Sequence, residues 1–325
     1  MTPSARNAVI FGGLGFIGTN LALRLSDLGW NVTVVDPISP ESLGVTDRLG
    51  ALGERVRVLC CGMEESRRVK EAVMDADVAF DVAGSTGHLA SMEDPIGDLN
   101  TNLVAHLKYL EMARHVRPGL PLVLASTRQV LGSPASGVIN DSLAPQPVDA
   151  NGVSKVALES YLKVFGSVWE MPSVVVRLPN VFGPHMRVVD SANGVIGGWV
   201  GQALRDRRLT LYDGGQARRN VLFVDDAVDA ILASCDLVHA SAPTFLIGGE
   251  EISLHDIAFA IADLTGAEVL MQQMPPQLRR IALDSVIIDD SRFREQATWS
   301  PRVRFPEGLR QSLSFYEERE HLYAR

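Results

Sequence analysis

Three glycines, each separated from the next by two residues, follow a short apolar run near the start of the chain. They are Gly12, Gly15 and Gly18, after the run 8–11. Beyond them, apolar residues recur with the spacing of an amphipathic helix, at Ile17, Leu21, Leu25 and Leu28. Gly12 can adopt backbone angles closed to other residues, Gly15 leaves the main chain open to close approach, and Gly18 lets the helix pack on the strand. The pattern predicts a strand, a tight turn and a helix whose free N–H groups and positive dipole end face an anion.

A second predicted strand, 32–36, ends in an acidic residue, Asp36. An acid about 20 residues beyond such glycines is where the ribose hydroxyl of a dinucleotide is held. The alternative interpretation is a tight strand–helix turn followed by an incidental acid. Asp36 would repel a 2′-phosphate, and Pro37, Ile38 and Ser39 offer no arginine to bind one. The pattern therefore predicts a bound dinucleotide and favours NAD over NADP.

Composition excludes several classes of protein. The 325 residues are 46% hydrophobic and 21% charged, as in an ordinary globular chain. A net charge of −9 opposes nonspecific binding to nucleic acid or to an anionic membrane. No apolar run reaches the roughly 18 residues of a membrane span, and the N-terminus lacks the features of a signal peptide. Cys60, Cys61 and Cys235 match neither a disulfide framework nor a zinc spacing. We therefore expect a reduced, cytoplasmic protein without a metal site.

Short apolar strands alternate with helical patterns as far as position 178. Further strands are predicted at 55–60, 77–83, 120–125 and 173–178, and helices at 64–74, 96–114 and 151–166. This alternation predicts an α/β fold with a doubly wound parallel sheet and a site at the carboxyl ends of the strands. From Pro179 the pattern loosens, which predicts a smaller, partly discontinuous C-terminal lobe. We expect a dinucleotide-binding domain over 1–178, to which about 220–248 returns, and a second lobe over 179–219 and 249–325.

Several sequence blocks resemble one family across nearly the whole chain. They are Gly12–Gly18, Ser126–Gly132, Ser154-Lys155, Arg177–Pro184, Arg219–Asp226, Ile247-Gly248-Gly249, Trp299-Ser300-Pro301 and Glu307-Gly308-Leu309. By their order and spacing the chain is identified as a member of the extended short-chain dehydrogenases/reductases, in the branch of NAD-dependent nucleotide-sugar epimerases and dehydratases. The resemblance implies a Rossmann domain with a nucleotide-sugar-binding lobe. It also implies a set of residues that contact NAD: Gly12, Gly15, Phe16, Ile17, Gly18, Asp36, Met63, Ala83 and Lys155.

The family's catalytic pair is a tyrosine and a lysine four residues later, which share one helix face. In the family the tyrosine exchanges a proton with a sugar hydroxyl, and the lysine holds the cofactor ribose and lowers the pKa of the tyrosine. Lys155 and the hydroxyl-bearing Thr127 stand at matching positions, and Asn102 matches an asparagine that supports the active site. The tyrosine position, however, is Asn151. An amide exchanges no proton near neutral pH, and acid–base help is worth about 10²–10⁴ in rate.

Another group would have to replace the tyrosine if the reaction keeps its proton transfer. His88 is the first candidate, because its loop, 84–88, follows the carboxyl end of a strand and an imidazole titrates in the right range. The alternative for His88 is a loop histidine bonded to backbone or water. Asp149 is a weaker candidate, and a water held by Asn151 and Thr127 is a further option. The sequence leaves these choices open, together with a protein that no longer turns over.

The two positions after Thr127 narrow the reaction. Dehydratases of the family carry an aspartate and a glutamate there, and decarboxylases tend to carry a glutamate at the second. This chain has Arg128 and Gln129 instead. Elimination and decarboxylation are therefore disfavoured, and an epimerase fits better. Arg128 is either a surface or structural arginine or a clamp on an anionic or hydroxyl-rich substrate.

Three further residues match substrate-contacting positions of the family. Arg219 matches an arginine on the nucleotide diphosphate, with an ion pair to Asp225 or Asp226 as the alternative. Asn180 matches an asparagine that bonds the diphosphate–sugar region, or it caps a turn. His185, also a weaker acid–base candidate, lies where the family's loop meets the substrate. As an exposed loop histidine it could equally be idle.

The retained cofactor positions and the missing dehydratase acids together predict an NAD-dependent epimerase of a nucleotide-diphosphate sugar. It would act by transient oxidation of a ring hydroxyl held by Thr127, with Lys155 on the nicotinamide ribose. The alternatives are a catalytically silent relative that binds NAD or a nucleotide sugar, and a nucleotide-sugar dehydrogenase or reductase. Two long helices often form the subunit interface in the family, so the resemblance implies a homodimer through 96–114 and 151–166.

Overall fold

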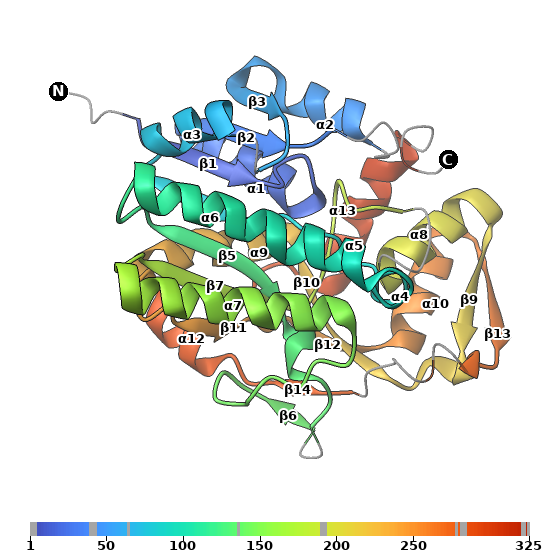
Figure 1. The fold of residues 1–325 in the computed structure, drawn as a ribbon. Coiled ribbons are helices and arrows are strands. Elements are labelled where there is room, and N and C mark those ends of the chain that lie inside the picture. The colour runs from blue at the N-terminus through green and yellow to red at the C-terminus, as the bar shows by residue number, and fades with distance from the viewer. Residues whose placement is uncertain are drawn as a thin grey trace.

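Seven parallel strands form the central sheet of the computed structural model, which describes residues 5–38, 44–63, 66–134, 137–188, 194–276, 279, 285–319 and 323 (Figure 1). The strands are β1 (Asn7–Phe11), β2 (Asn31–Asp36), β3 (Val56–Cys60), β4 (Val78–Asp81), β5 (Leu122–Thr127), β7 (Ser173–Leu178) and β11 (Thr244–Leu246). Their spatial order is β11-β7-β5-β4-β1-β2-β3. The chain winds outward in one direction through β1, β2 and β3 and in the other through β4, β5 and β7. The predicted α/β fold with a doubly wound parallel sheet is therefore confirmed, and its switch point lies between β1 and β4.

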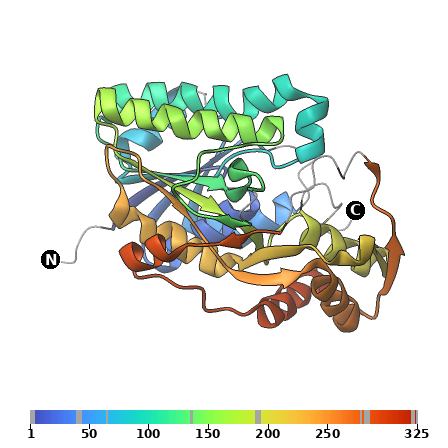
Figure 2. The same cartoon turned by 90° about the horizontal axis from the view of Figure 1, so that it is seen from below.

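Helices cover both faces of this sheet. Among the described residues, the helices are α1 (Phe16–Asp27), α2 (Val45–Leu52), α3 (Ser66–Asp75), α4 (His88–Glu93), α5 (Pro95–Leu99), α6 (Ala105–Val116), α7 (Ala150–Trp169), α8 (Val195–Asp206), α9 (Val224–Ala233), α10 (Leu254–Thr265), α12 (Ser291–Ala297) and α13 (Phe305–Glu317). Of these, α8 and α10 pack against each other rather than on this sheet. Along β1, Val9 and Phe11 pack with the residues of α3, α6 and α7, whereas Ala8 and Ile10 pack with those of α1 and α9. Figure 2 shows α6 and α7 lying together along one face. A strand that is buried on both faces carries the continuous apolar run that the sequence displays.

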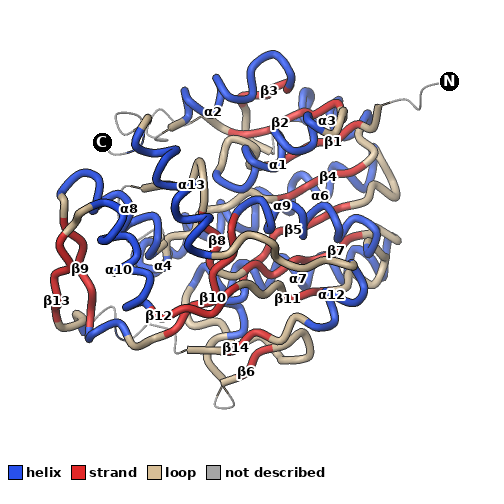
Figure 3. The backbone as a smooth tube through the Cα atoms, turned by 180° about the vertical axis from the view of Figure 1, so that it is seen from behind, coloured by secondary structure: helices blue, strands red, loops and turns tan. Residues whose placement is uncertain are grey.

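Smaller sheets lie beside the carboxyl ends of the large one (Figure 3). They join β8 (Asn180–Phe182), β10 (Arg218–Phe223) and β12 (Glu250–Ser253) in one sheet, β9 (Arg208–Tyr212) with β13 (Glu268–Gln272), and β6 (Val138–Ile139) with β14 (Ile287–Ile288). After the chain has passed through β10, β11 returns to the edge of the large sheet beside β7. The two-lobe boundaries given above stay a prediction. Within the described residues, no helix has the length and apolarity needed to cross a membrane.

The helix predicted over 96–114 is interrupted. The structure has α5, a π-helical turn over Asn100–Val104 and then α6, with α4 as an additional short helix before them. Asn102 is buried inside the π turn beside Leu103. A buried amide next to a buried leucine breaks the polar–apolar period on which the sequence prediction relied, and π turns are frequent at functional sites.

Candidate functional site

The glycine-rich turn between β1 and α1 is built to face an anion. Gly12 has a φ of 77°, and a Cβ on Gly18 would lie 2.2 Å from the carbonyl oxygen of Gly12. Gly15 is the N-cap of α1 and gives it no side-chain cap, and the first turn of α1 contains no acidic residue. The first amides of α1, including those of Phe16 and Ile17, therefore keep the positive end of the helix available to a phosphate group.

Asp36, at the end of β2, lies beside this turn. Its Oδ2 accepts a hydrogen bond from the Leu14 amide at 2.9 Å. Burial raises the pKa of Asp36, while the Leu14 amide and the positive charge of Arg48 oppose that change. The carboxyl group is thus fixed against the glycine turn, as a residue that binds a ribose must be. Pro37 and Ile38, which follow Asp36, belong to the described residues, whereas Ser39 lies outside them.

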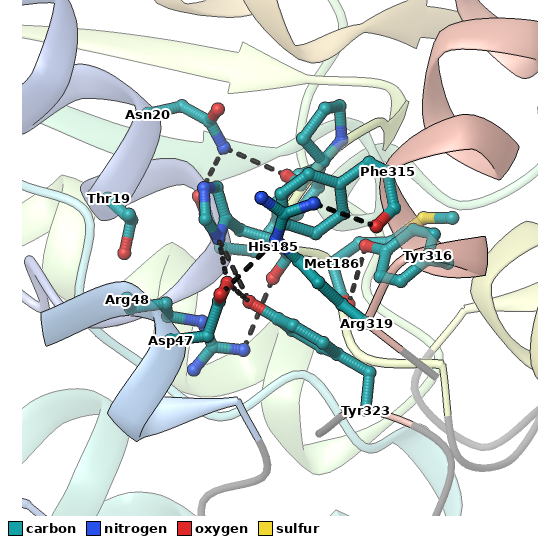
Figure 4. A network of polar contacts seen from close by, with 12 residues as sticks. Thr19, Asn20, Asp47, Arg48, His185, Met186, Phe315, Tyr316, Arg319 and Tyr323 are labelled. Atoms are coloured by element: carbon teal, nitrogen blue, oxygen red, sulfur yellow. Dashed lines mark hydrogen bonds and ion pairs between the residues drawn. The ribbon is translucent and has the colours of Figure 1, made fainter. Parts of the chain in front are cut away.

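Arg48 is a residue that sequence reasoning missed. It comes from α2, is buried, and donates from Nη1 to the carbonyl oxygen of Leu14 at 3.0 Å and from Nη2 to that of His185 at 3.2 Å. Its guanidinium also faces the ring of Tyr323 at 5.7 Å. Arg48 therefore links the glycine turn to the loop after β8 and to the end of the chain (Figure 4). No local motif marks this residue, because its partners lie far away in the sequence.

The expectation that His185 is exposed is wrong. The residue is 5% exposed, has a φ of 68°, and shares a hydrogen bond at 2.9 Å between its Nδ1 and the Tyr323 hydroxyl, which donates in turn to Asp47 at 2.8 Å (Figure 4). Burial lowers the pKa of His185 to about 4. The loop folds inward because Tyr323 and Phe315 close over it. A contact with substrate stays a prediction for this residue.

Lys155, on α7, lies near the carboxyl ends of the sheet strands, beside the loop that follows β4. It is buried, and its Nζ donates to the carbonyl oxygen of Ala83, just after β4, at 3.1 Å. Ala83 in turn touches the glycine turn, because a Cβ on Gly12 would lie 2.5 Å from its Cα. Burial lowers the pKa of Lys155, and the charges of Asp81, Asp98 and Glu159 oppose this change. The glycine turn, Ala83 and Lys155 thus form one continuous edge.

Asn151 occupies the position four residues before Lys155, one turn earlier on α7. It is buried, and its Nδ2 donates to the carbonyl oxygen of Ser85 at 2.8 Å and to Asp98 Oδ2 at 3.0 Å. The amide therefore joins α7 to α5 and to the loop after β4. Since both bonds use the NH₂ group, Asn151 acts in this structure as a cross-link.

Asp98 is the centre of a buried polar cluster that the sequence did not indicate. Besides Asn151, its carboxylate accepts from Asn102 Nδ2 at 2.8 Å and from Ser154 Oγ at 2.8 Å. Asn102 Oδ1 accepts from the Ser85 amide at 3.0 Å. Asn102 thus holds the loop after β4, which agrees with the supporting role that the resemblance implied. The i,i+4 spacing of Asp98 and Asn102 was the available signal.

Thr127 and Arg128 stand at the end of β5. Thr127 Oγ1 accepts from the Gln129 amide at 3.2 Å and caps the 3₁₀ turn over Arg128–Leu131. Arg128 is 5% exposed, so the surface alternative is wrong. Arg219, half-buried on β10, is the charged neighbour of Arg128, and one of its Nη atoms donates to the Arg218 carbonyl oxygen at 2.8 Å.

The structure gives each of the remaining predicted residues a position in the fold. His88 begins α4, so the loop predicted over 84–88 ends one residue earlier, and the His88 side chain lies outside what the structure describes. Asp149 is buried as the N-cap of α7, where its Oδ1 accepts from the Gly152 amide at 2.7 Å. Met63 packs beside the core after β3, and Asn180 begins β8 opposite Val221. Their contacts with cofactor or substrate stay predictions.

A glycine turn at the switch point of a doubly wound sheet, an acid at the end of the second strand and a buried lysine at the carboxyl edge define a dinucleotide-binding enzyme. The chain belongs to the NAD dependent epimerase/dehydratase family, whose model matches residues 8–248. The family and the NAD cofactor predicted from the sequence are therefore confirmed.

Individual relatives cover almost the entire chain. A UDP-glucose 4-epimerase of Mycolicibacterium smegmatis is 26% identical over 96% of this chain and 98% of its own. A UDP-glucuronic acid decarboxylase of Xenopus tropicalis is 28% identical over 97% of this chain and 73% of its own. Among solved structures, the UDP-glucose 4-epimerase of Thermus thermophilus in complex with NAD superposes with a TM-score of 0.82 at 25% identity, covering 96% of this chain and 99% of that one.

Proposed function

We propose that the protein is an NAD-dependent epimerase that acts on a nucleotide-diphosphate sugar. The observation that carries this proposal is the continuous edge from the glycine turn through Ala83 to Lys155, with Asp36 at its other end. The epimerases among the relatives support the reaction type. Decarboxylation, the reaction of the decarboxylase relative, is the competing possibility. It is disfavoured because Arg128 and Gln129 leave no carboxylate directly after Thr127.

Each part of the edge has a task in binding the cofactor. The first amides of α1 bind the pyrophosphate, Asp36 binds the adenosine ribose, and Lys155 holds the nicotinamide ribose. When bound, NAD supplies a reversible acceptor for a hydride from a hydroxyl-bearing ring carbon. Lys155 is buried, so water has little access to its ammonium group. Met63 and Ala83 complete the contacts by their main chains.

The proton of the reacting hydroxyl needs an acceptor other than Asn151, whose NH₂ group is held by Ser85 and Asp98. Asp149 caps α7, and His185 is held by Tyr323. We therefore assign the acid–base role to His88, which begins α4 directly after the loop beside Lys155. Thr127 orients the hydroxyl, and Arg219 and Asn180 bind the diphosphate.

An apolar stripe on α7 supports a homodimer. Val153, Tyr161, Val164 and Val168 are 56%, 41%, 49% and 60% exposed, and their spacing places them on one helix face. Exposed apolar side chains gathered on one helix face mark an association surface. We also propose that the protein works in the cytoplasm, because its three cysteines are free thiols.

The test is turnover of a panel of nucleotide sugars by the NAD-loaded protein, followed by proton NMR. We expect one sugar to convert to its epimer without net reduction of the cofactor. If every sugar returns unchanged although NAD is bound, the enzyme proposal is contradicted. The second candidate, a silent relative that only binds, is favoured by the double hydrogen bond of Asn151. Calorimetric binding of a nucleotide sugar without turnover would support that candidate.

A further inference from the structure

Arg128 is a buried cation whose hydrogen bonds are incomplete. The residue directly follows β5, is 5% exposed, and its Nη1 has no hydrogen-bond partner among the described residues. Leaving a buried polar group unpaired costs about 1–3 kcal/mol, and more for a charged group. Such a group calls for an explanation, and a ligand that satisfies it in the working protein is one of them.

Two other buried arginines in the described part of the chain have partners for their terminal Nη atoms within the chain. Arg177 and Glu159, both 3% exposed, are joined at 2.6 Å between Nη2 and Oε2, and Arg177 Nε donates to Oε1 of the same carboxylate. Arg48 donates from both Nη atoms to main-chain carbonyl oxygens, although its Nε has no partner among the described residues. Arg128 differs from both in that a terminal Nη atom, at the outer end of the guanidinium group, is buried without a partner among the described residues.

The charged neighbour of Arg128 makes its position less favourable. Burial lowers the pKa of Arg128 to about 10, and the positive charge of Arg219 acts in the same direction. Arg128 still carries its charge at neutral pH. Two arginines from different sheets, one at the end of β5 and one on β10, thus lie close enough for their positive charges to repel each other.

We infer that Arg128 and Arg219 form a two-cation site in which Arg128 binds a carboxylate on the sugar of the substrate. This inference rests on the proposed function, in which Arg219 binds the diphosphate. Because Arg128 immediately follows Thr127, which holds the reacting hydroxyl, its guanidinium belongs to the sugar side of the site. The planar fork of arginine matches a carboxylate by two parallel hydrogen bonds. The substrate class is therefore a nucleotide-diphosphate hexuronate rather than a neutral hexose.

The binding test uses matched pairs that differ at one carbon: UDP-glucose with UDP-glucuronic acid, and GDP-mannose with GDP-mannuronic acid. Calorimetry on the NAD-loaded protein should show, for one pair, a preference for the uronate of about 10- to 100-fold. The variant Arg128→Met should remove this preference while affinity for the neutral partner and for the free nucleoside diphosphate stays within about threefold. Arg128→Lys keeps the charge but loses the planar fork, so its preference for the uronate should lie between those of the wild type and Arg128→Met.

A second measurement needs no ligand. In the ligand-free protein, Arg128→Met removes an unpaired buried charge and should raise the midpoint of thermal unfolding by about 2 °C. The matched control is Arg177→Met, which leaves the buried carboxylate of Glu159 without its ion-pair partner and should lower the midpoint. If Arg128→Met lowers the midpoint as the control does, Arg128 serves structure and the inference is overturned.

The remaining outcomes separate this inference from the proposed function. The carboxylate site is overturned if the wild-type protein binds uronate and neutral sugar with equal affinity. It is also overturned if Arg128→Met loses affinity equally for both sugars and for the nucleoside diphosphate, or if the NAD-loaded protein binds neither pair. Epimerisation of neutral sugars with no uronate preference would keep the function and remove the inference. A uronate preference lost in Arg128→Met, without turnover, would keep the inference and remove the function.

Discussion

The main chain of Ala83 passes so close to Gly12 that a Cβ on Gly12 would lie 2.5 Å from the Ala83 Cα. The carbonyl oxygen of the same Ala83 accepts the hydrogen bond of Lys155 at 3.1 Å. One residue thus connects the glycine turn to the lysine that we propose holds the nicotinamide ribose. The pairing of β1 with β4, which ends two residues before Ala83, holds Ala83 beside the glycine turn.

Gly15→Ala and Gly18→Ala should separate cofactor binding from folding. A Cβ at position 15 meets only the Gly12 carbonyl oxygen, at 3.1 Å, whereas one at position 18 would lie 2.2 Å from that oxygen. We expect Gly15→Ala to lose less than about 1 kcal/mol of unfolding free energy and at least about tenfold in NAD affinity. Gly18→Ala should lose both. NAD content after purification and chemical denaturation measure this, and full NAD occupancy in Gly15→Ala would contradict the phosphate site.

Asn151→Asp should destabilise the protein in a pH-dependent way. The new carboxylate would stand about 3 Å from that of Asp98, and two such groups cannot both ionise. The pKa of the pair rises in the folded state, so the folded protein binds more protons than the unfolded chain and stability returns as the pH falls. We expect a loss of about 3 kcal/mol at pH 7, smaller at pH 5.

The control for that variant is Ser154→Ala, which removes one donor to Asp98 without adding charge. It should cost about 1 kcal/mol at both pH values. Urea denaturation of both variants at pH 7 and pH 5 makes the comparison. A pH-independent loss in Asn151→Asp would show that Asn151 does not face Asp98 in solution.

His185 should make stability fall on mild acidification. Burial lowers its pKa to about 4, below the value near 6.5 of an unfolded chain. Between these values the unfolded chain binds more protons, so unfolding free energy decreases as the pH falls from about 6.5 to about 4, by about 3 kcal/mol in total. His185→Asn keeps a residue that tolerates a φ of 68° and should flatten the profile. The exposed His239→Asn should not, and parallel profiles for wild type and His185→Asn would contradict the buried neutral imidazole.

His88→Gln should lower kcat by about 10²–10⁴ while NAD occupancy and thermal stability stay unchanged, because only the proton acceptor is lost. His115→Gln, on the exposed end of α6, is the matched control and should keep the wild-type rate. Steady-state kinetics on the best substrate of the panel decides. A wild-type kcat in His88→Gln would contradict the acid–base role of His88, and a water molecule or Lys155 would then be the candidate proton acceptor.

The apolar stripe on α7 should hold the dimer together. Val164→Glu places a charge in the middle of the stripe, and we expect light scattering to show a monomer because a buried unpaired charge costs several kcal/mol. Leu264→Glu, at an exposed apolar position on α10, should leave the dimer intact. A wild-type protein that already elutes as a monomer would remove the proposal.

Local sequence patterns predicted the glycine turn and Asp36 because each depends on spacing within one or two elements, whereas Lys155 came from the resemblance to the family. They also predicted β1, β2, β3, β4, β5 and β7 of the doubly wound sheet, whose apolar runs follow from burial on both faces, but not the short edge strand β11. They failed where partners are distant: Tyr323 reaches Asp47 across 276 positions, and no pattern marks Arg48 or the burial of His185. The π turn at Asn102 was also missed, because it interrupts the helical period without a proline or a glycine.

The most direct test is a crystal structure of the protein with NAD and a nucleotide sugar. It should place the adenosine ribose against Asp36, the pyrophosphate on the first amides of α1 and the nicotinamide ribose within hydrogen-bond distance, about 3 Å, of Lys155 Nζ. A nicotinamide ring far from Lys155, or a crevice closed by side chains with the dinucleotide elsewhere, would contradict the proposed epimerase site.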